Sequence, residues 1–447
     1  MARFLIAVWP ISGHLYPNLA LASALRQRGH VVAFYTGNAA GPALEREGFE
    51  RLPFRALDSD ALEQIFDDGY FDEPVLWRRL RRQKAIYREW LVGTLPGQIA
   101  DLEEALRRWR PDVIVSDPTM WAPFLVLHEK HGIPVAVFSY TMGCLLPGRD
   151  GPVAGPGLPP PRTPWTRLLN AVYGFVQSVA TADIRRQANA VRQEHGLPPL
   201  QVTVTEHAGT MPLYLVTSVP ELDYQRGDLP PNVRYVGPCL WPGPEVDRPA
   251  WMDELPSDQP WVHVTEGTVH KRRPFLLQAA ARGLANLPVQ VIMAVGRHRR
   301  IDDLGLGPLA PNVRVESWIP YRHLLPLTDL VVTAGGAGTI MAALAEGIPL
   351  VVSPTEWDKP ENAQRVAWSG VGVRISPRAC TPERLRAAVE RILGEPSYRR
   401  AAQRIAEAFS RYGGPREAAE LLEGLLGATS VSATSSQVTG AVVEGGL

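Results

Sequence analysis

Residues 330–354 read LVVTAGGAGTIMAALAEGIPLVVSP, which combines a strand, a glycine turn, a helix and a second strand. The opening apolar run is typical of a buried strand, and it leads directly into Gly335, Gly336 and Gly338. Thr339 then opens a helical pattern, so bare backbone N–H groups and the positive end of a helix are expected together. This arrangement favours an anion site, most naturally for a diphosphate. The alternative is a tight turn from strand to helix that holds no ligand.

The spacing of these glycines differs from two common phosphate motifs. The turn lacks the Lys of GxxxxGK[ST], and the third glycine of GxGxxG is absent. A further turn, TEGT at 265–268, follows another strand candidate in the same half of the chain. By itself this second turn is a weak signal, but Thr268 is a candidate to offer a hydroxyl group to the same phosphate.

Outward from this stretch, short apolar runs alternate with helical patterns, as they do in parallel sheets covered by helices. One such helix is predicted at 17–28, where Pro17 stands at the start and Gly29 follows the end. The sequence therefore predicts an α/β protein with two Rossmann-like, doubly wound domains and a cleft between them. Strands are expected at 4–9, 31–35, 113–116, 134–138, 213–217, 261–265, 289–295, 313–315, 330–333, 349–353 and 371–375.

A Pro-rich stretch divides the chain. Residues 241–260 read WPGPEVDRPAWMDELPSDQP, which has little periodicity and is typical of a linker. We expect an N-terminal domain at 1–240 and a C-terminal domain at 261–396. Residues 428–447 are small, polar and almost uncharged, so the composition predicts a disordered tail there.

Overall charge and cysteine content narrow the class of ligand and the compartment. Lys plus Arg (46) balances Asp plus Glu (46), so the net charge gives no reason to expect nucleic acid or an anionic membrane as partner. The three cysteines are odd in number and far apart, which argues against a disulfide framework. No apolar run approaches the roughly 18 residues of a membrane span. A small ligand and a cytoplasmic location are expected.

Two titratable residues follow strand candidates of the N-terminal half. His14 stands in SGHLYP after the first strand, and Asp117 follows the strand VIVS. Because the carboxyl ends of parallel strands share one edge, His14 is a candidate general base, and Asp117 is a candidate to hold its imidazole by a hydrogen bond. The alternatives are a residue near a helix cap for His14 and a turn residue before Pro118 for Asp117.

The motifs that carry chemistry resemble those of family-one nucleotide-sugar glycosyltransferases of the GT-B fold, especially bacterial natural-product enzymes. The resemblance spans nearly the whole chain. It rests on GHLYPNLALASALRQRGHVV, VIVSD, WIPYRHLLPLTDLVVTAGGAGT and IPLVVSPTEWDKPENAQRV. It implies that the N-terminal domain binds the acceptor and the C-terminal domain the nucleotide sugar, and that helices at about 397–426 return to the N-terminal domain.

The resemblance also implies residue roles for inverting transfer. His14 would deprotonate an acceptor hydroxyl with support from Asp117, and Asp358 would hold the sugar hydroxyls. The remaining donor contacts, to base and diphosphate, would come from Trp318, Ile319, Gly336, Gly338, Thr339 and Thr268.

Three positions depart from the pattern of the family. Ala334 stands where a His usually precedes the glycines, Ala342 replaces the Glu that grips the ribose, and Lys359 replaces a Gln after the sugar-binding acid. A thymidine nucleotide lacks the ribose 2′-hydroxyl and would suffer less from the missing Glu. Either a UDP-sugar or a dTDP-sugar is therefore expected as donor, and Lys359 is a candidate to replace a lost contact.

Aromatic residues gather in the N-terminal half, partly on segments that the family uses for the acceptor. Trp77, Trp90, Trp121 and Tyr140 are candidates to line a broad apolar acceptor site. The alternative for each is ordinary filling of the core.

The expected reaction is transfer of a sugar to a hydroxyl of a hydrophobic small molecule, without a cofactor or an essential metal. Asp58 and Asp60 form a DxD pattern, which resembles a metal signature but is more typical of a helix start here. Two alternatives stay open: a sugar-nucleotide epimerase of the same fold, and an inactive homologue that acts as a partner or activator. The chain is expected to be a monomer or a homodimer.

Overall fold

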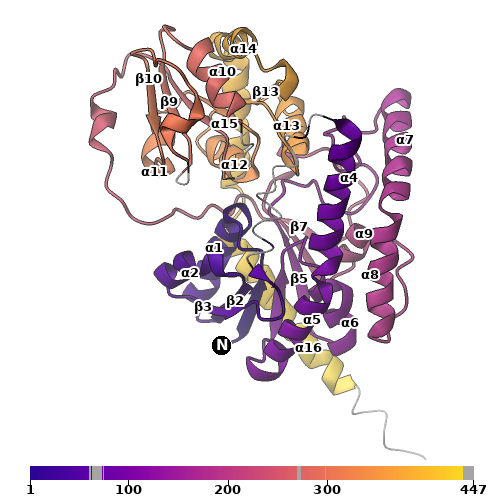
Figure 1. Ribbon diagram of the computed structural model, residues 1–447. Helices are drawn as coiled ribbons and strands as arrows, with labels where there is room; N and C mark the ends of the chain where they lie inside the picture. The colour runs from indigo at the N-terminus through magenta and orange to yellow at the C-terminus, as the bar shows by residue number, and fades with distance from the viewer. Residues whose placement is uncertain (60–61, 63–72, 74, 269–272, 297–298, 436–447) are drawn as a thin grey trace, which may run out of the picture.

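The computed structural model describes residues 1–435 apart from 60–61, 63–72, 74, 269–272 and 297–298, and it contains two β-sheets. Figure 1 shows the two sheets in separate lobes, each accompanied by helices. The strands pair in parallel, as between β1 and β4 or between β8 and β11. Most strand residues are buried, as expected where helices cover both faces of a parallel sheet. The predicted α/β class with two doubly wound domains is confirmed.

The N-terminal sheet has seven strands in the order β3-β2-β1-β4-β5-β6-β7. Sequence patterns predicted all of them except the two edge strands, which are short and partly exposed. The bounds are β1 Arg3–Ala7, β2 Val31–Thr36, β3 Glu50–Pro53, β4 Val113–Ser116, β5 Val135–Ser139, β6 Leu213–Val216 and β7 Val233–Tyr235.

The C-terminal sheet has six strands in the order β10-β9-β8-β11-β12-β13, and the sequence predicted each of them. Between the last N-terminal strand and this sheet, the predicted linker contains one short 3-10 helix, η6 at Ala250–Asp253. The bounds are β8 Trp261–Thr265, β9 Gln290–Ala294, β10 Val313–Glu316, β11 Leu330–Thr333, β12 Leu350–Val352 and β13 Gly372–Arg374.

Helices connect successive strands in both domains. In the N-terminal domain they are α1 Ser12–Gln27, α2 Gly41–Glu47, α4 Leu76–Tyr87, α5 Leu95–Arg108, α6 His128–His131, α7 Pro164–Ala180, α8 Ala182–Glu194 and α9 Val204–Ala208, with π-helical segments η3 at Arg88–Gly93 and η4 at Pro123–Leu127. In the C-terminal part they are α10 Phe275–Gly283, α11 Tyr321–Leu324, α12 Ala337–Ala345, α13 Lys359–Trp368, α14 Pro382–Gly394, α15 Pro396–Ser410 and α16 Pro415–Ser435.

The first helix begins earlier than the sequence predicted. α1 starts at Ser12, so Pro17 lies inside the helix and His14 lies in its first turn. Proline lacks an N–H group, but near a helix start this removes only one early hydrogen bond. Pro17 therefore does not mark the start of the helix. His14 belongs to the first turn of the helix that follows β1.

Packing of the last two helices differs from the expectation for 397–426. α15 packs against α12 and α14 of the C-terminal domain and also against a 3-10 helix of the N-terminal domain, η5 at Pro220–Leu222, whereas α16 packs against α1 and β4 of the N-terminal domain. Figure 1 shows α16, in yellow, running beside the N-terminal sheet. Ala418, Ala419 and Leu422 are buried there because small and apolar side chains face the core.

The predicted disordered tail also differs in its first part. α16 continues through Ser435, whereas residues 436–447 lie outside the described residues. Composition alone misses such a continuation, because a helix that is already packed can extend by one hydrogen bond per added residue.

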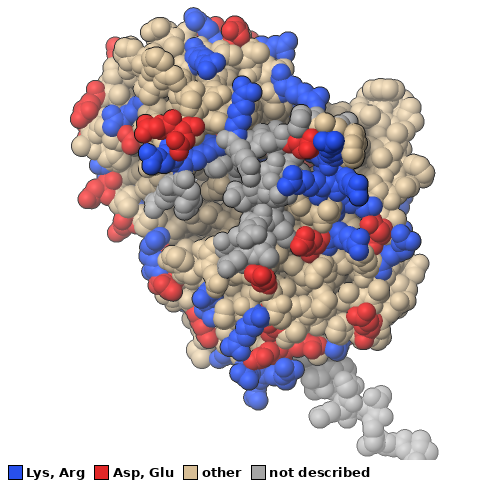
Figure 2. All heavy atoms as spheres, viewed as in Figure 1, with Lys and Arg blue, Asp and Glu red and all other residues tan. Residues whose placement is uncertain are grey.

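Charge is mixed over the surface. Figure 2 shows Lys and Arg interspersed with Asp and Glu over this face, in keeping with the zero net charge of the chain. In the described part of the chain, the helices are too short or too polar to traverse a lipid bilayer.

Candidate active site

His14 and Asp117 lie together at the carboxyl end of the N-terminal sheet. β1 and β4 are neighbours with Ala7 opposite Ser116, and the Asp117 N–H donates to the Ala7 carbonyl at 2.9 Å. This pairing brings the residues that follow the two strands to the same edge. The His14 Nδ1 lies 2.6 Å from Asp117 Oδ2, and the Asp117 side chain is fully buried.

The other carboxylate oxygen of Asp117 is also fixed. Asp117 Oδ1 accepts from the Thr119 N–H at 2.8 Å and from the Thr119 hydroxyl at 2.6 Å. A carboxylate held on both oxygens favours Nδ1–H on His14 and leaves Nε2 as the nitrogen that can accept a proton. The pair thus has the geometry of a general base and the group that orients it.

Tyr140 lies closer to His14 than sequence reasoning expected. It follows β5, which neighbours β4, and its hydroxyl oxygen lies 2.6 Å from His14 Nδ1 and 2.8 Å from Nε2. Burial raises the pKa of Tyr140 well above its usual value, and the charge of Asp117 adds to the effect, so the side chain stays a neutral phenol. Tyr140 was predicted only as a wall for the acceptor, although its place after β5 puts it at the same sheet edge.

The glycine turn after β11 is bare and open. Gly335 has a φ of +95°, which favours glycine, and Gly336 is the N-cap residue of α12. A Cβ placed on Gly336 or Gly338 would meet no atom within 4 Å, so both positions border open space. The first turn of α12 therefore presents backbone N–H groups to that space, which suits a phosphate. Thr339 lies in the same turn, with its hydroxyl 3.3 Å from that of Tyr321.

Asp358 is joined to this turn through Asn362, which the sequence analysis did not identify. The Asn362 side-chain amide donates to Asp358 Oδ2 at 2.8 Å and to the Gly335 carbonyl at 3.0 Å. The spacing of four residues at the start of a helix is the signal that could have found it. One fully buried side chain thus sets the candidate sugar-binding acid relative to the candidate diphosphate turn.

Asp358 also lies on the side of its domain that meets the N-terminal domain. Burial raises the pKa of its carboxyl group, while Asn362, Lys359 and then His14 act in the opposite direction. Trp357, the residue before Asp358, packs edge to face against Tyr87 and Trp90 of the N-terminal domain, so the loop that carries Asp358 lies against that domain. Lys359 is buried beside Asp358, and its Nζ donates to the Thr355 hydroxyl at 2.9 Å.

The remaining donor candidates occupy loops at the carboxyl ends of β8 and β10. Thr268 is exposed after β8, Trp318 is 39% exposed after β10, and Ile319 is buried beneath it. The loop after β8 is fixed by Glu266, whose carboxylate accepts from Arg299 at 2.6 Å. Sequence reasoning missed this pair because its two members lie in different loops.

The four aromatic candidates for the acceptor are dispersed. Trp77 is 60% exposed on α4, whereas Trp90 is buried in the core of the N-terminal domain. Trp121 is half-buried after β4, and Tyr140 meets His14. The structure therefore brings Tyr140 to His14 but gives Trp90 the packing of a core residue.

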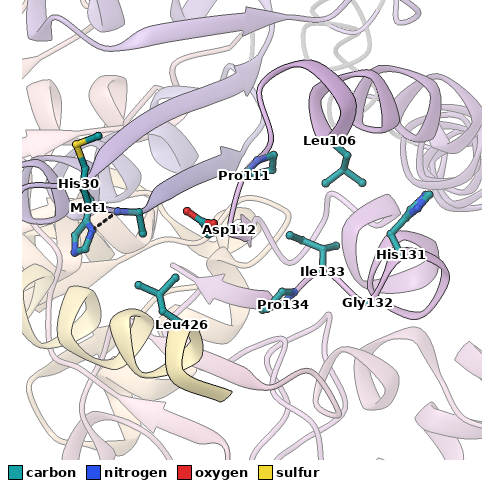
Figure 3. A pocket seen from close by; sticks show the side chains of 11 residues that line it. Met1, His30, Leu106, Pro111, Asp112, His131, Gly132, Ile133, Pro134 and Leu426 are labelled. Atoms are coloured by element: carbon teal, nitrogen blue, oxygen red, sulfur yellow. Dashed lines mark hydrogen bonds between the residues drawn. The ribbon is translucent and has the colours of Figure 1, made fainter. Parts of the chain in front are cut away.

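A hollow of about 630 Å³ lies at the opposite end of the N-terminal sheet (Figure 3). Ala2, Asp112 and Pro134, which line it, directly precede β1, β4 and β5. Ligands of open α/β sheets bind beyond the carboxyl ends of strands, so this hollow is at the wrong edge for the reaction. None of the predicted site residues lines it.

Comparison with known proteins gives one family. Residues 281–425 match the family described as erythromycin biosynthesis protein CIII-like, C-terminal domain. The chain is 37% identical over 428 residues to 4′-demethylrebeccamycin synthase of Lentzea aerocolonigenes, covering 95% of this chain and 100% of the relative. It is 28% identical over 443 residues to demethyllactenocin mycarosyltransferase of Streptomyces fradiae, covering 95% and 87%.

Solved structures agree in fold. The glycotransferase of kitacinnamycin aligns with a TM-score of 0.71 and 26% identity over 95% of this chain and 99% of that protein. The glycosyltransferase VinC in complex with dTDP aligns with a TM-score of 0.69 and 23% identity, again over 95% and 99%. Both likenesses cover nearly the whole chain and show the same two-domain fold. On this full-length similarity the chain belongs to the family-one, GT-B-fold glycosyltransferases of bacterial natural-product biosynthesis, enzymes that use nucleotide sugars.

Proposed function

We propose that the protein transfers a sugar, with inversion, from a nucleoside diphosphate sugar to a hydroxyl group of a hydrophobic small molecule. The observation that carries the proposal is the pair of His14 and buried Asp117, joined at 2.6 Å, with the loop of Asp358 from the other domain packed against the N-terminal domain through Trp357. A base on one domain and a sugar-binding acid on the other are what a transfer across the cleft requires.

In the proposed step, His14 Nε2 accepts the proton of the acceptor hydroxyl as its oxygen attacks the anomeric carbon. The bond from that carbon to the diphosphate oxygen breaks, and its electron pair leaves with the diphosphate. Asp117 stabilises the imidazolium that forms, because its carboxylate faces Nδ1. The N–H groups at the start of α12 then hold the charge that develops on the leaving group.

We propose a thymidine or uridine diphosphate sugar as donor, with no strong preference for uridine. Ala342 is half-buried on α12 and offers no hydrogen bond to a ribose hydroxyl. The similar glycosyltransferase VinC has been solved with dTDP, which supports a thymidine nucleotide.

We also propose that the reaction needs no metal ion, because helix N-termini and glycine amides can hold a departing diphosphate. Asp60, one half of the DxD pattern, lies outside the described residues. Incubation with EDTA should leave the rate unchanged. Loss of turnover that returns on addition of Mg²⁺ or Mn²⁺ would reject this part of the proposal.

The test of the function begins with binding. Thermal-shift titrations with uridine, thymidine and guanosine diphosphates show which nucleotide raises the melting temperature, since a ligand stabilises by RT ln(1 + [L]/Kd). Matching donors are then incubated with a panel of aromatic polycyclic and macrolide alcohols, and products are identified by mass spectrometry. Turnover of the donor without any acceptor would instead indicate an epimerase. Nucleotide binding without turnover of any donor would indicate an inactive homologue.

A further inference from the structure

Arg365 joins the two domains through a buried set of hydrogen bonds. It lies on α13, two turns after Asp358, and its side chain is 1% exposed. Its Nε donates to Asp223 Oδ1 at 2.9 Å, and its Nη2 donates to the Gly143 carbonyl at 2.9 Å. Asp223 and Gly143 both belong to the N-terminal domain, so one guanidinium group reaches two separate segments of it.

The contacts continue along the same helix. Arg365 Nη1 donates to Glu361 Oε2 at 3.1 Å, and Glu361 Oε1 accepts from the N–H of Gly157 in the N-terminal domain at 3.1 Å. Arg374, the last residue of β13, donates to the carbonyls of Gly157 at 2.7 Å and Pro156 at 3.0 Å. Both arginines therefore extend from the donor domain to loops of the acceptor domain.

Backbone packing at this boundary is close. A Cβ on Gly157 would lie 2.1 Å from the carbonyl oxygen of Pro360, and one on Gly143 would lie 2.7 Å from Asp223 Oδ2. Gly143 and Gly157 also have positive φ angles of 96° and 68°. A larger side chain at Gly157 would push α13 away from the N-terminal domain, and one at Gly143 would displace Asp223, the partner of Arg365.

The cluster is balanced in charge, and most of its side chains are fully buried. Asp223 and Glu361 carry two negative charges, and Arg365 and Arg374 carry two positive ones. The side chains of Asp223, Glu361 and Arg365 are each at most 1% exposed. Buried ion pairs of this kind add little to stability compared with apolar packing, but removal of one partner is costly, and they can specify a single arrangement. Here these ion pairs specify how α13 lies against the N-terminal domain.

We infer that Arg365 is a positioning residue for sugar transfer: through Asp223 and Gly143 it fixes α13 against the acceptor domain, so that Asp358 faces His14. This inference rests on the proposed function. Arg365 touches neither the donor turn nor the His14 pair, and it acts through the helix whose first turn carries Asp358 and Asn362.

Arg365→Lys is the primary test, because Lys keeps the charge but cannot donate to three separate partners from one planar group. A small misplacement between reacting groups commonly costs about 10²-fold in rate. We expect kcat to fall by about 10- to 100-fold, while the affinity for the nucleoside diphosphate, measured by calorimetry, changes less than about twofold. The nucleotide is expected to contact the C-terminal domain, which the substitution leaves intact. Asp223→Asn provides a second variant, which keeps the shape of the side chain that accepts from Arg365. It should likewise lower kcat while it leaves the affinity for the nucleoside diphosphate nearly unchanged.

Arg192→Lys is the matched control. Arg192 is also buried, and it forms a forked pair with Glu129 at 2.9 and 3.0 Å, but entirely within the N-terminal domain. It should lower the melting temperature without a comparable fall in kcat. An equal loss of kcat in the Arg192 and Arg365 variants, or an unchanged kcat in Arg365→Lys, would overturn the inference.

Small-angle X-ray scattering of the full chain separates this inference from the proposed function. Arg365→Lys and Asp223→Asn should increase the radius of gyration and broaden the distance distribution, whereas Arg192→Lys should leave both unchanged. This readout needs no substrate, so it remains valid even if the wild-type protein transfers no sugar to any acceptor. Identical scattering from all four proteins would show that the cluster does not hold the domains.

Discussion

The ring of Trp357 meets the ring of Trp90 edge to face, with centroids 5.5 Å apart and planes at 85°. Trp357 belongs to the loop between β12 and α13 of the C-terminal domain, whereas Trp90 is buried in the N-terminal domain. Trp357 also stands edge-on to Tyr87 and has a φ of 63°, a left-handed conformation that is unfavourable for so large a residue. The residue directly before Asp358 is thus fixed on the N-terminal domain.

Removal of this indole should weaken the contact between the domains. Each edge-to-face aromatic pair contributes about 0.5–1.5 kcal/mol beyond its buried area, so Trp357→Ala is expected to lower the free energy of unfolding by a few times that amount. Trp357→Phe keeps an aromatic ring and should lose less. Urea denaturation followed by circular dichroism measures both values. A Trp357→Ala protein as stable as the wild type would show that the ring contacts are not maintained in solution.

His14→Ala should lower kcat by about 10²- to 10⁴-fold while it leaves the affinity for nucleoside diphosphate nearly unchanged, because a general base acts on the acceptor hydroxyl. Asp117→Asn should cost less, since it removes the charge but keeps an oxygen near Nδ1. His207→Gln is a control, because His207 is a buried histidine that contacts the Phe124 carbonyl at 2.9 Å, outside the candidate active site. Turnover at the wild-type rate by His14→Ala would remove His14 from the mechanism.

Donor choice should respond to Ala342. The wild-type protein is expected to use a thymidine donor at least as well as the uridine donor with the same sugar. Ala342→Glu should shift the ratio of kcat/KM values towards uridine by adding a partner for the 2′-hydroxyl, a hydrogen bond worth roughly 0.5–3 kcal/mol. Ala345→Glu adds the same charge to α12 one turn away and should leave the ratio unchanged. A strong uridine preference in the wild type that Ala342→Glu does not alter would place ribose recognition elsewhere.

Lys359→Gln should weaken use of the donor. Lys359 is buried, donates to the Thr355 hydroxyl at 2.9 Å and directly follows Asp358, so it places a positive charge next to the candidate sugar and diphosphate site. We expect a higher KM for the donor with a smaller change for the acceptor, measured by initial rates. Lys84→Gln removes an equal charge from a pair with Asp183 on the surface of the N-terminal domain and serves as control. Equal donor KM values in the wild type and Lys359→Gln would contradict the assigned role.

Stability of the C-terminal domain should fall in mild acid because of His263. This side chain is fully buried on β8, where its Nδ1 faces the Ile292 carbonyl at 3.0 Å, and burial lowers its pKa from 6.5 to about 4. Between these pH values the His263 side chain is protonated in the unfolded chain but neutral in the folded protein. The free energy of unfolding therefore decreases as pH falls from about 6.5 to about 4. The decrease is on the order of 3 kcal/mol.

Urea denaturation of the wild type and His263→Asn at pH 7.5, 6.5, 5.5 and 4.5 tests this behaviour. Asn does not titrate, so its curve should be flatter over this range even if the variant is less stable at every pH. Parallel curves for the two proteins would assign the acid sensitivity to other groups.

Much of the fold could be predicted because parallel strands buried on both faces form distinct apolar runs. β3 was missed because Glu50–Pro53 contains one apolar side chain and two charged ones, as an edge strand permits. His14 and Asp117 could be paired in advance because the topology brings the ends of adjacent strands together. Arg365 and Asp223 could not, since they are 142 residues apart and a buried ion pair has no local sequence pattern. Trp77 and Trp90 likewise look alike in sequence, although only Trp90 is buried.

The return of α16 to the N-terminal domain constrains the order in which the protein matures during synthesis. Leu422 and its neighbours close the apolar face formed by α1 and the strands beneath it, but they are translated only after the entire C-terminal domain. The apolar face of the N-terminal domain therefore stays uncovered until the C-terminal domain and α16 have been translated. A chain released before residue 415 would expose this surface permanently and would be prone to aggregate, even though both sheets were complete.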